Sequence, residues 1–106
     1  MSHDEIVRHV TERVRQTFPE LVRLLLYGSR ARGDARPDSD YDLLVVTPLP
    51  PEARNRAVAL RLALLDLDST FDIVVMTPAE FESLRTSAGY WQRSVLREAV
   101  VLHEAA

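Results

Sequence analysis

The chain has 106 residues, of which 46% are hydrophobic and 27% are charged, and its formal net charge is −3. This length and composition support one globular domain, and the absence of cysteine excludes disulfides and thiolate metal sites and favours a reducing cytoplasm. No run approaches the ~20 apolar residues of a membrane helix, the N-terminus lacks the apolar core of a signal peptide, and the acidic balance argues against direct nucleic-acid binding.

The first half of the chain predicts one helix followed by two strands. Ser2 and Glu5 form the S-x-x-E pattern of a capping box, apolar residues then recur at helical spacing, and Pro19 marks the end of the helix. Residues 21–28 are a nearly continuous apolar run, which is typical of a strand buried on both faces. A polar loop with a brief helical start separates this run from a second strand over residues 40–47.

The second half predicts three helices and two strands. The helices are expected over residues 52–67, 79–85 and 90–99, and the first two follow prolines, which suit a helix start. The strands are expected over residues 70–77 and 100–104. Because the strands lie between helices along the chain, this order predicts a compact α/β (α+β) domain.

The stretch GSRARGDARPDSDYD carries the clearest chemical signal. Gly28 and Ser29 end the first strand, ten residues intervene, and Asp40 and Asp42 open the second. Glycine lets the backbone approach a phosphate closely, and serine adds a hydroxyl and an N–H for its oxygens. Asp40 and Asp42 project from the same face of a strand, with Cα atoms roughly 6.6 Å apart, which suits ligands of one or two Mg²⁺ ions. The stretch therefore predicts metal-dependent chemistry on a nucleotide phosphate.

Asp72 is the candidate for a third carboxylate. It lies inside the apolar run of residues 70–77, where a lone charge is costly without a partner. A cation shared with Asp40 and Asp42 would supply that partner. The alternatives are an exposed position at the start of the strand or an ion pair with an arginine such as Arg32.

A second D-x-D pattern is formed by Asp66 and Asp68. These two residues end a predicted helix instead of opening a buried strand, and no Gly-Ser pair precedes them. We therefore expect solvated carboxylates there and not metal ligands.

Arginines surround the loop that would face the phosphate, and they are the only basic residues besides histidine. The lack of lysine excludes a P-loop. Arg32 is the best candidate for a phosphate contact, because a guanidinium fork matches phosphate oxygens. A bridge from Arg32 to Asp34 or Asp38 is an equally good interpretation. Arg30 is expected to be more exposed, and Tyr27 is expected to pack beneath the motif.

With these residues in place, nearly the whole chain resembles the minimal nucleotidyltransferases, the smallest branch of the DNA polymerase β-like superfamily. The family pattern of GS, ten residues and DxD is met at residues 28–29 and 40–42, and a later strand aspartate matches Asp72. The ARG at residues 31–33 also fits the family. Arg30 departs from it, since the family often has an aromatic or small residue there.

The resemblance implies the nucleotidyltransferase fold, a short mixed β-sheet flanked by helices, here expected on one side of the sheet, with residues 1–106 as a single domain. It also implies transfer of a nucleoside monophosphate from a triphosphate with the help of two Mg²⁺ ions, or of Mn²⁺ as the alternative. In that scheme Asp40 and Asp42 hold both ions, Asp72 completes the site and orients or deprotonates the attacking hydroxyl, and Gly28 and Ser29 fix the departing pyrophosphate.

The resemblance also suggests partners. Family members of this size are often antitoxins encoded beside a helical HEPN ribonuclease toxin, and some adenylylate a tyrosine of that toxin with ATP. The expected function is therefore AMP transfer to a hydroxyl of a docked protein, with the last helix and its Tyr90 and Trp91 as docking surface. Two alternatives stay open, a non-enzymatic antitoxin that acts by binding alone and a transferase for a small acceptor of the aminoglycoside type. An exposed sheet edge also favours a homodimer or a hetero-oligomer.

Overall fold

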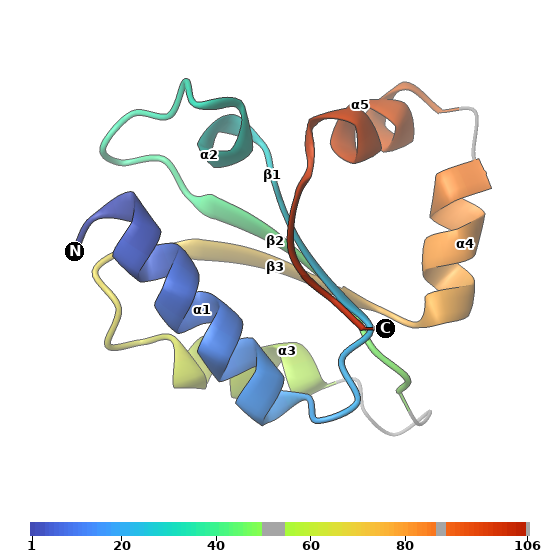
Figure 1. Ribbon diagram of the computed structural model, residues 1–106, viewed down its shortest axis with the longest axis horizontal. Coiled ribbons are helices and arrows are strands. Elements are labelled where there is room, and N and C mark those ends of the chain that lie inside the picture. Colours follow the sequence, from blue (N-terminus) through green and yellow to red (C-terminus); the bar gives the residue numbers. More distant parts are fainter. Residues whose placement is uncertain (50–54, 87–88, 106) are drawn as a thin grey trace.

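The computed structural model describes residues 1–49, 55–86 and 89–105, apart from the side chains of Arg56, Tyr90 and Trp91. The elements follow one another as α1 (His3–Thr17), β1 (Arg23–Tyr27), α2 (Ser29–Arg32), β2 (Tyr41–Val46), α3 (Arg56–Ala63), β3 (Phe71–Met76), α4 (Pro78–Thr86), α5 (Tyr90–Glu98) and β4 (Val100–Glu104) (Figure 1). This order confirms the predicted alternation of helices and strands. Within the described ranges, no helix is long and apolar enough to cross a membrane.

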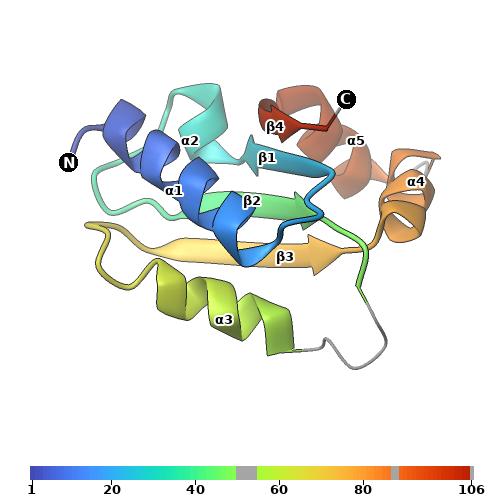
Figure 2. The ribbon, with the colours of Figure 1, turned by 60° about the horizontal axis from the view of Figure 1, so that its bottom comes forward.

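The sheet is mixed, as predicted, with the strand order β3-β2-β1-β4 (Figure 2). β1 runs antiparallel to β2 and to β4, whereas β2 and β3 are parallel. The parallel pair follows from the chain path, because α3 lies between β2 and β3 and carries the chain back to the starting edge of the sheet. The carboxylates that open β2 and β3 therefore meet at one edge.

Helices cover both faces of the sheet, so the expectation of helices on one side is wrong. In Figure 1, α1 and α3 lie on one side of the strands and α4 and α5 on the other. The reason is visible in β1, where Leu24, Leu25 and Leu26 are all buried. Successive side chains of a strand point to opposite faces, so an unbroken apolar run needs cover on both. Leu24 and Leu26 pack in one core cluster and Leu25 in the other.

α1 forms as the sequence predicts. Ser2 and Glu5 make both hydrogen bonds of the capping box, and Ile6, Val10 and Val14 are buried against the sheet. α3 is shorter than predicted, and the expected residues 52–54 lie outside the described ranges.

We expect the core on the α1 side to supply a large part of the stability. Leu24 is 0% exposed in the central strand β1, so Leu24→Ala should lower the free energy of unfolding by about 3 kcal/mol through lost burial and a residual cavity. Leu65→Ala is the matched control, since Leu65 is 75% exposed and its truncation should change stability by less than about 0.5 kcal/mol. Urea unfolding of both variants gives the comparison, and similar losses would contradict this account of the core.

Candidate active site

Gly28 brings the backbone of the β1–α2 turn against the carboxylate of Asp42. Its φ is +73° and its ψ is −159°, a conformation open almost only to glycine. A Cβ added to Gly28 would overlap Asp42 Oδ2 and lie 3.1 Å from Asp42 Cγ. The glycine of the motif is therefore required by a close approach to the second aspartate of the D-x-D pattern, as well as by backbone conformation.

Strand pairing places three polar side chains in one row. Asp42 is the register partner of Tyr27 in β1 and of Asp72 in β3. Adjacent strands lie about 4.8 Å apart, so the carboxylates of Asp42 and Asp72 start from neighbouring backbone positions. Asp42 alternates with Leu44, which packs in the cluster under α4, so this row faces the α4/α5 side of the sheet.

Like charges gather in this row. Burial, helped by the negative charges of Asp72 and Asp40 and opposed by Arg32, raises the pKa of Asp42. Burial and the charges of Asp42 and Asp72 raise the pKa of Tyr27 to about 12, so this tyrosine stays neutral beneath the carboxylates. An incoming cation would relieve the repulsion between the aspartates, and carboxylate oxygens are ligands that Mg²⁺ accepts.

Asp40 lies one residue before β2 and is exposed, and it accepts a hydrogen bond from the hydroxyl of Thr70. Among the described residues, no three histidine, cysteine, aspartate or glutamate side chains form a group that could hold a metal ion as they stand. Asp42 and Asp72 are thus side by side in register, whereas Asp40 would have to turn away from Thr70 to join them.

Asp72 is exposed at the second position of β3. The expectation that it is buried and needs a partner for that reason is wrong, and the alternative of an exposed strand start is what the structure has. Its place beside Asp42, and not its burial, connects it to the candidate site.

Arg32 is engaged in two ion pairs. Its Nε lies 3.2 Å from Asp34 Oδ2 and its Nη1 lies 3.0 Å from Glu98 Oε2. The bridge to Asp34 is one of the two interpretations drawn from the sequence, whereas Glu98 was not foreseen. These carboxylates raise the pKa of Arg32 further and tie α2 to the end of α5.

Arg30 is less exposed than Arg32, contrary to expectation. Its guanidinium carbon lies 4.6 Å from the centroid of the Tyr41 ring, and its nitrogens donate to backbone carbonyls of the loop before Asp40. These contacts cannot be predicted from residue spacing in the sequence, because they depend on the path of the loop.

The second D-x-D pattern lies elsewhere. Asp66 accepts two hydrogen bonds from the guanidinium of Arg13 in α1, at 2.5 and 3.0 Å, so it ties the turn after α3 to α1. Asp68 is exposed, and its only ion pair in the described part of the chain is with the terminal amine, at 3.8 Å.

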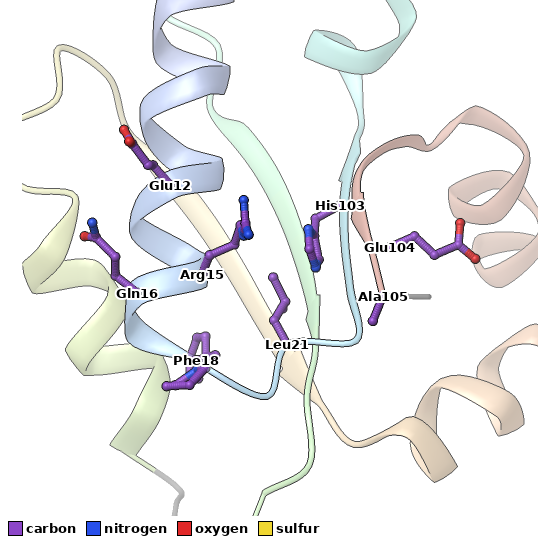
Figure 3. A pocket seen from close by; sticks show the side chains of 9 residues that line it. Glu12, Arg15, Gln16, Phe18, Leu21, His103, Glu104 and Ala105 are labelled. Atoms are coloured by element: carbon purple, nitrogen blue, oxygen red, sulfur yellow. The ribbon is translucent and has the colours of Figure 1, made fainter.

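A cavity of about 560 Å³ lies between the second half of α1 and β4 (Figure 3). Its lining includes Phe18, Leu21, His103 and Glu104. Glu104 pairs in register with Arg23 at the start of β1, whereas Gly28 follows the end of that strand. The cavity therefore lies at the opposite end of β1 from the row of carboxylates and is not part of the candidate site.

The structure thus combines a mixed sheet with a Gly-Ser turn packed on a strand aspartate, an arrangement suited to a phosphate group and a cation. The chain belongs to the nucleotidyltransferase domain family, whose family model matches residues 7–102. Its fold and family are those of a nucleotidyltransferase enzyme. The resemblance drawn from the sequence is thereby confirmed at the level of the nucleotidyltransferase domain family. A comparison with curated proteins finds no match.

Solved structures share this fold. A toxin–antitoxin crystal structure with AMP-PNP is 24% identical, with 93% of this chain and 73% of that chain covered and a TM-score of 0.65. In the structure of a tri-AMPylated Shewanella oneidensis HEPN toxin in complex with an MNT antitoxin, the matched chain is 18% identical. The match covers 98% of this chain and 74% of that chain, with a TM-score of 0.65. A putative nucleotidyltransferase from Sulfolobus solfataricus is 24% identical, with 93% and 80% covered and a TM-score of 0.55.

Proposed function

We propose that this chain moves AMP from ATP to a hydroxyl of a partner protein, and that the partner is a HEPN ribonuclease toxin that is modified on tyrosine and so neutralised. The observation that carries the proposal is the close packing of Gly28 on Asp42, with Asp72 beside Asp42 in register. Structures of toxin–antitoxin complexes with the same fold, one with AMP-PNP and one with an AMPylated HEPN toxin, support the choice of nucleotide and partner.

The donor set fits a divalent cation. Asp40 and Asp42 would hold two Mg²⁺ ions, with Mn²⁺ as the alternative, and Asp72 would complete the site. Burial, and then the negative charges of Asp72 and Asp40, raise the pKa of Asp42, and a bound cation would relieve the repulsion between these carboxylates. When bound, the metal would neutralise phosphate charge and polarise the phosphorus centre that is attacked.

The remaining chemistry falls to side chains of this chain. Gly28 lets the turn pack directly against Asp42 and so holds that carboxylate in place. The hydroxyl of Ser29, which has no hydrogen-bond partner among the described residues, donates to a phosphate oxygen. Arg32 would exchange Asp34 or Glu98 for a phosphate oxygen. In the transfer itself, the acceptor oxygen bonds to the α-phosphorus as the bond to the pyrophosphate oxygen breaks, and Asp72 takes the hydroxyl proton.

The test takes the protein encoded by the neighbouring gene as the candidate toxin and measures its intact mass after incubation with this chain, ATP and Mg²⁺. We expect the mass to increase by one or more AMP units, and we expect Asp40→Ala to abolish the increase. Full neutralisation of the toxin by Asp40→Ala without a change in mass would favour an antitoxin that acts by binding alone. Transfer to an aminoglycoside but not to the protein would favour a small acceptor.

A further inference from the structure

Arg30 lies between the two halves of the GS and DxD motif and contacts the chain before Asp40. It directly follows Ser29 in α2. Its Nε and Nη2 donate to the carbonyl oxygen of Ser39 at 3.2 and 2.9 Å, and Nη2 also reaches the carbonyl oxygen of Pro37 at 3.3 Å. Ser39 is the residue immediately before Asp40, so one guanidinium holds the loop at the point where the first carboxylate emerges.

On the other side of Asp40, the same guanidinium lies over the ring of Tyr41, 4.6 Å from its centroid and within cation–π range. The ring is a fixed support because Tyr41 is 1% exposed. Its hydroxyl lies 3.0 Å from Nδ1 of His3 in α1, and its backbone N–H donates to the carbonyl oxygen of Thr70 at 3.0 Å. Arg30 therefore ties the loop that precedes Asp40 to the sheet that follows it.

Arg30 reaches Asp40 through the backbone and not from the row of carboxylates. Tyr41 packs in the core cluster with α1 and α3, whereas Asp42 faces the α4/α5 side. Neighbouring residues of a strand point to opposite faces, so a guanidinium stacked on Tyr41 lies on the far side of the sheet from Asp42. From that place its contacts reach the chain on either side of Asp40 and not the row of carboxylates.

We propose that Arg30 is a positioning residue that clamps the backbone on both sides of Asp40 and thereby fixes this carboxylate for metal binding. The metal-binding part rests on the function proposed above, whereas the clamp itself does not. This clamp requires arginine, because the planar guanidinium can donate to two carbonyl oxygens while its face stacks on a ring. Lysine has only one compact ammonium group and cannot do both.

The variants are Arg30→Met, which keeps length but removes the charge and the fork, and Arg30→Lys, which keeps a cation over Tyr41 but loses the fork. The matched control is Arg36→Met in the same loop, because the exposed side chain of Arg36 forms no hydrogen bond or ion pair with the described residues. Arg30→Lys provides the test if Arg30→Met does not fold.

The first measurement is amide hydrogen exchange followed by NMR. The N–H groups of Ser39 and Tyr41 donate to carbonyl oxygens at 3.0 Å on either side of Asp40. In Arg30→Met we expect their exchange to be at least ~10-fold faster because the loop opens locally more often, with a smaller increase in Arg30→Lys and none in Arg36→Met. Unchanged exchange in both Arg30 variants would overturn the clamp.

The second measurement is Mn²⁺ binding by electron paramagnetic resonance, without nucleotide or partner protein. Loss of a group that orients a metal ligand typically weakens binding 10–100-fold, so we expect at least a ~10-fold higher Kd in Arg30→Met and a wild-type Kd in Arg36→Met. Faster exchange with an unchanged Kd would show a purely structural role and overturn the proposal. If the wild-type chain binds no Mn²⁺, the proposed function fails, and the exchange data still support or overturn the clamp.

Discussion

Replacing Asp42 with asparagine is expected to reduce AMP transfer about a thousandfold without unfolding the chain. Asp42 is the carboxylate on which Gly28 packs and the register partner of Asp72. An asparagine side chain has nearly the same shape as aspartate but carries no negative charge. It therefore cannot hold the metal ion that would neutralise the phosphates. Removing one preorganised electrostatic contact to a transition state typically costs about 10²–10³ in rate, and here the loss extends to a shared metal.

The same substitution should leave thermal stability unchanged or raise it in the metal-free chain. Burial and the charges of Asp72 and Asp40 raise the pKa of Asp42 above its ordinary value. A carboxyl with a raised folded-state pKa opposes folding above that pKa, and its penalty disappears as the pH falls below the unfolded value. The penalty grows as the pH rises above the unfolded-state pKa, and asparagine removes it because its side chain carries no charge. The measurement is the Tm at pH 7 in EDTA.

Asp66→Asn is the matched control, since it makes the same chemical change in the second D-x-D pattern. Asp66 pairs with Arg13 and is exposed, so its loss should leave the transfer rate within about twofold of wild type. Equal losses of transfer in Asp42→Asn and Asp66→Asn, or a large drop in the Tm of Asp42→Asn, would show that the assignment of the site is wrong.

The parts of the fold that follow from local patterns could be predicted from the sequence. The capping box of Ser2 and Glu5 depends on residues three apart, and the strand over residues 100–104 depends on an unbroken apolar start. The register of Asp42 with Asp72 depends in addition on the parallel pairing of β2 with β3, which the sequence analysis did not predict and the structure shows. Residue spacing and apolar runs along the chain are enough to predict the capping box and the last strand.

Contacts set by the path of a loop or by distant segments could not be predicted. Glu98 meets Arg32 only because α5 packs beside α2, and nothing near Arg32 indicates a partner 66 positions away. Arg30 and Tyr41 meet because the loop of residues 34–40 folds back on the sheet. The expected burial of Asp72 failed for a related reason, since hydrophobic neighbours in sequence do not fix where a strand leaves solvent. The sequence therefore located the carboxylates better than the side chains that hold them.

Gly28→Ala is expected to lower AMP transfer about a hundredfold, more than its effect on stability explains. The φ of +73° with a ψ of −159° already costs an L-residue about 1–3 kcal/mol. The new methyl group would also overlap Asp42 Oδ2, and the nearest relief is rotation of that carboxylate. Rotation preserves the fold but moves the oxygen away from its place beside Asp72. The measurement is kcat/KM for transfer, together with urea unfolding.

Gly33→Ala separates backbone strain from loss of the carboxylate position. Gly33 also has a positive φ, +84°, but a Cβ there would meet nothing within 4 Å. It should therefore lose about 1 kcal/mol of stability and keep its transfer activity. In an Asp42→Asn background, Gly28→Ala should cost little further activity, because both changes act on one carboxylate and their effects do not add. Full additivity would mean that Gly28 serves the reaction by another route, such as approach of the phosphate to its backbone.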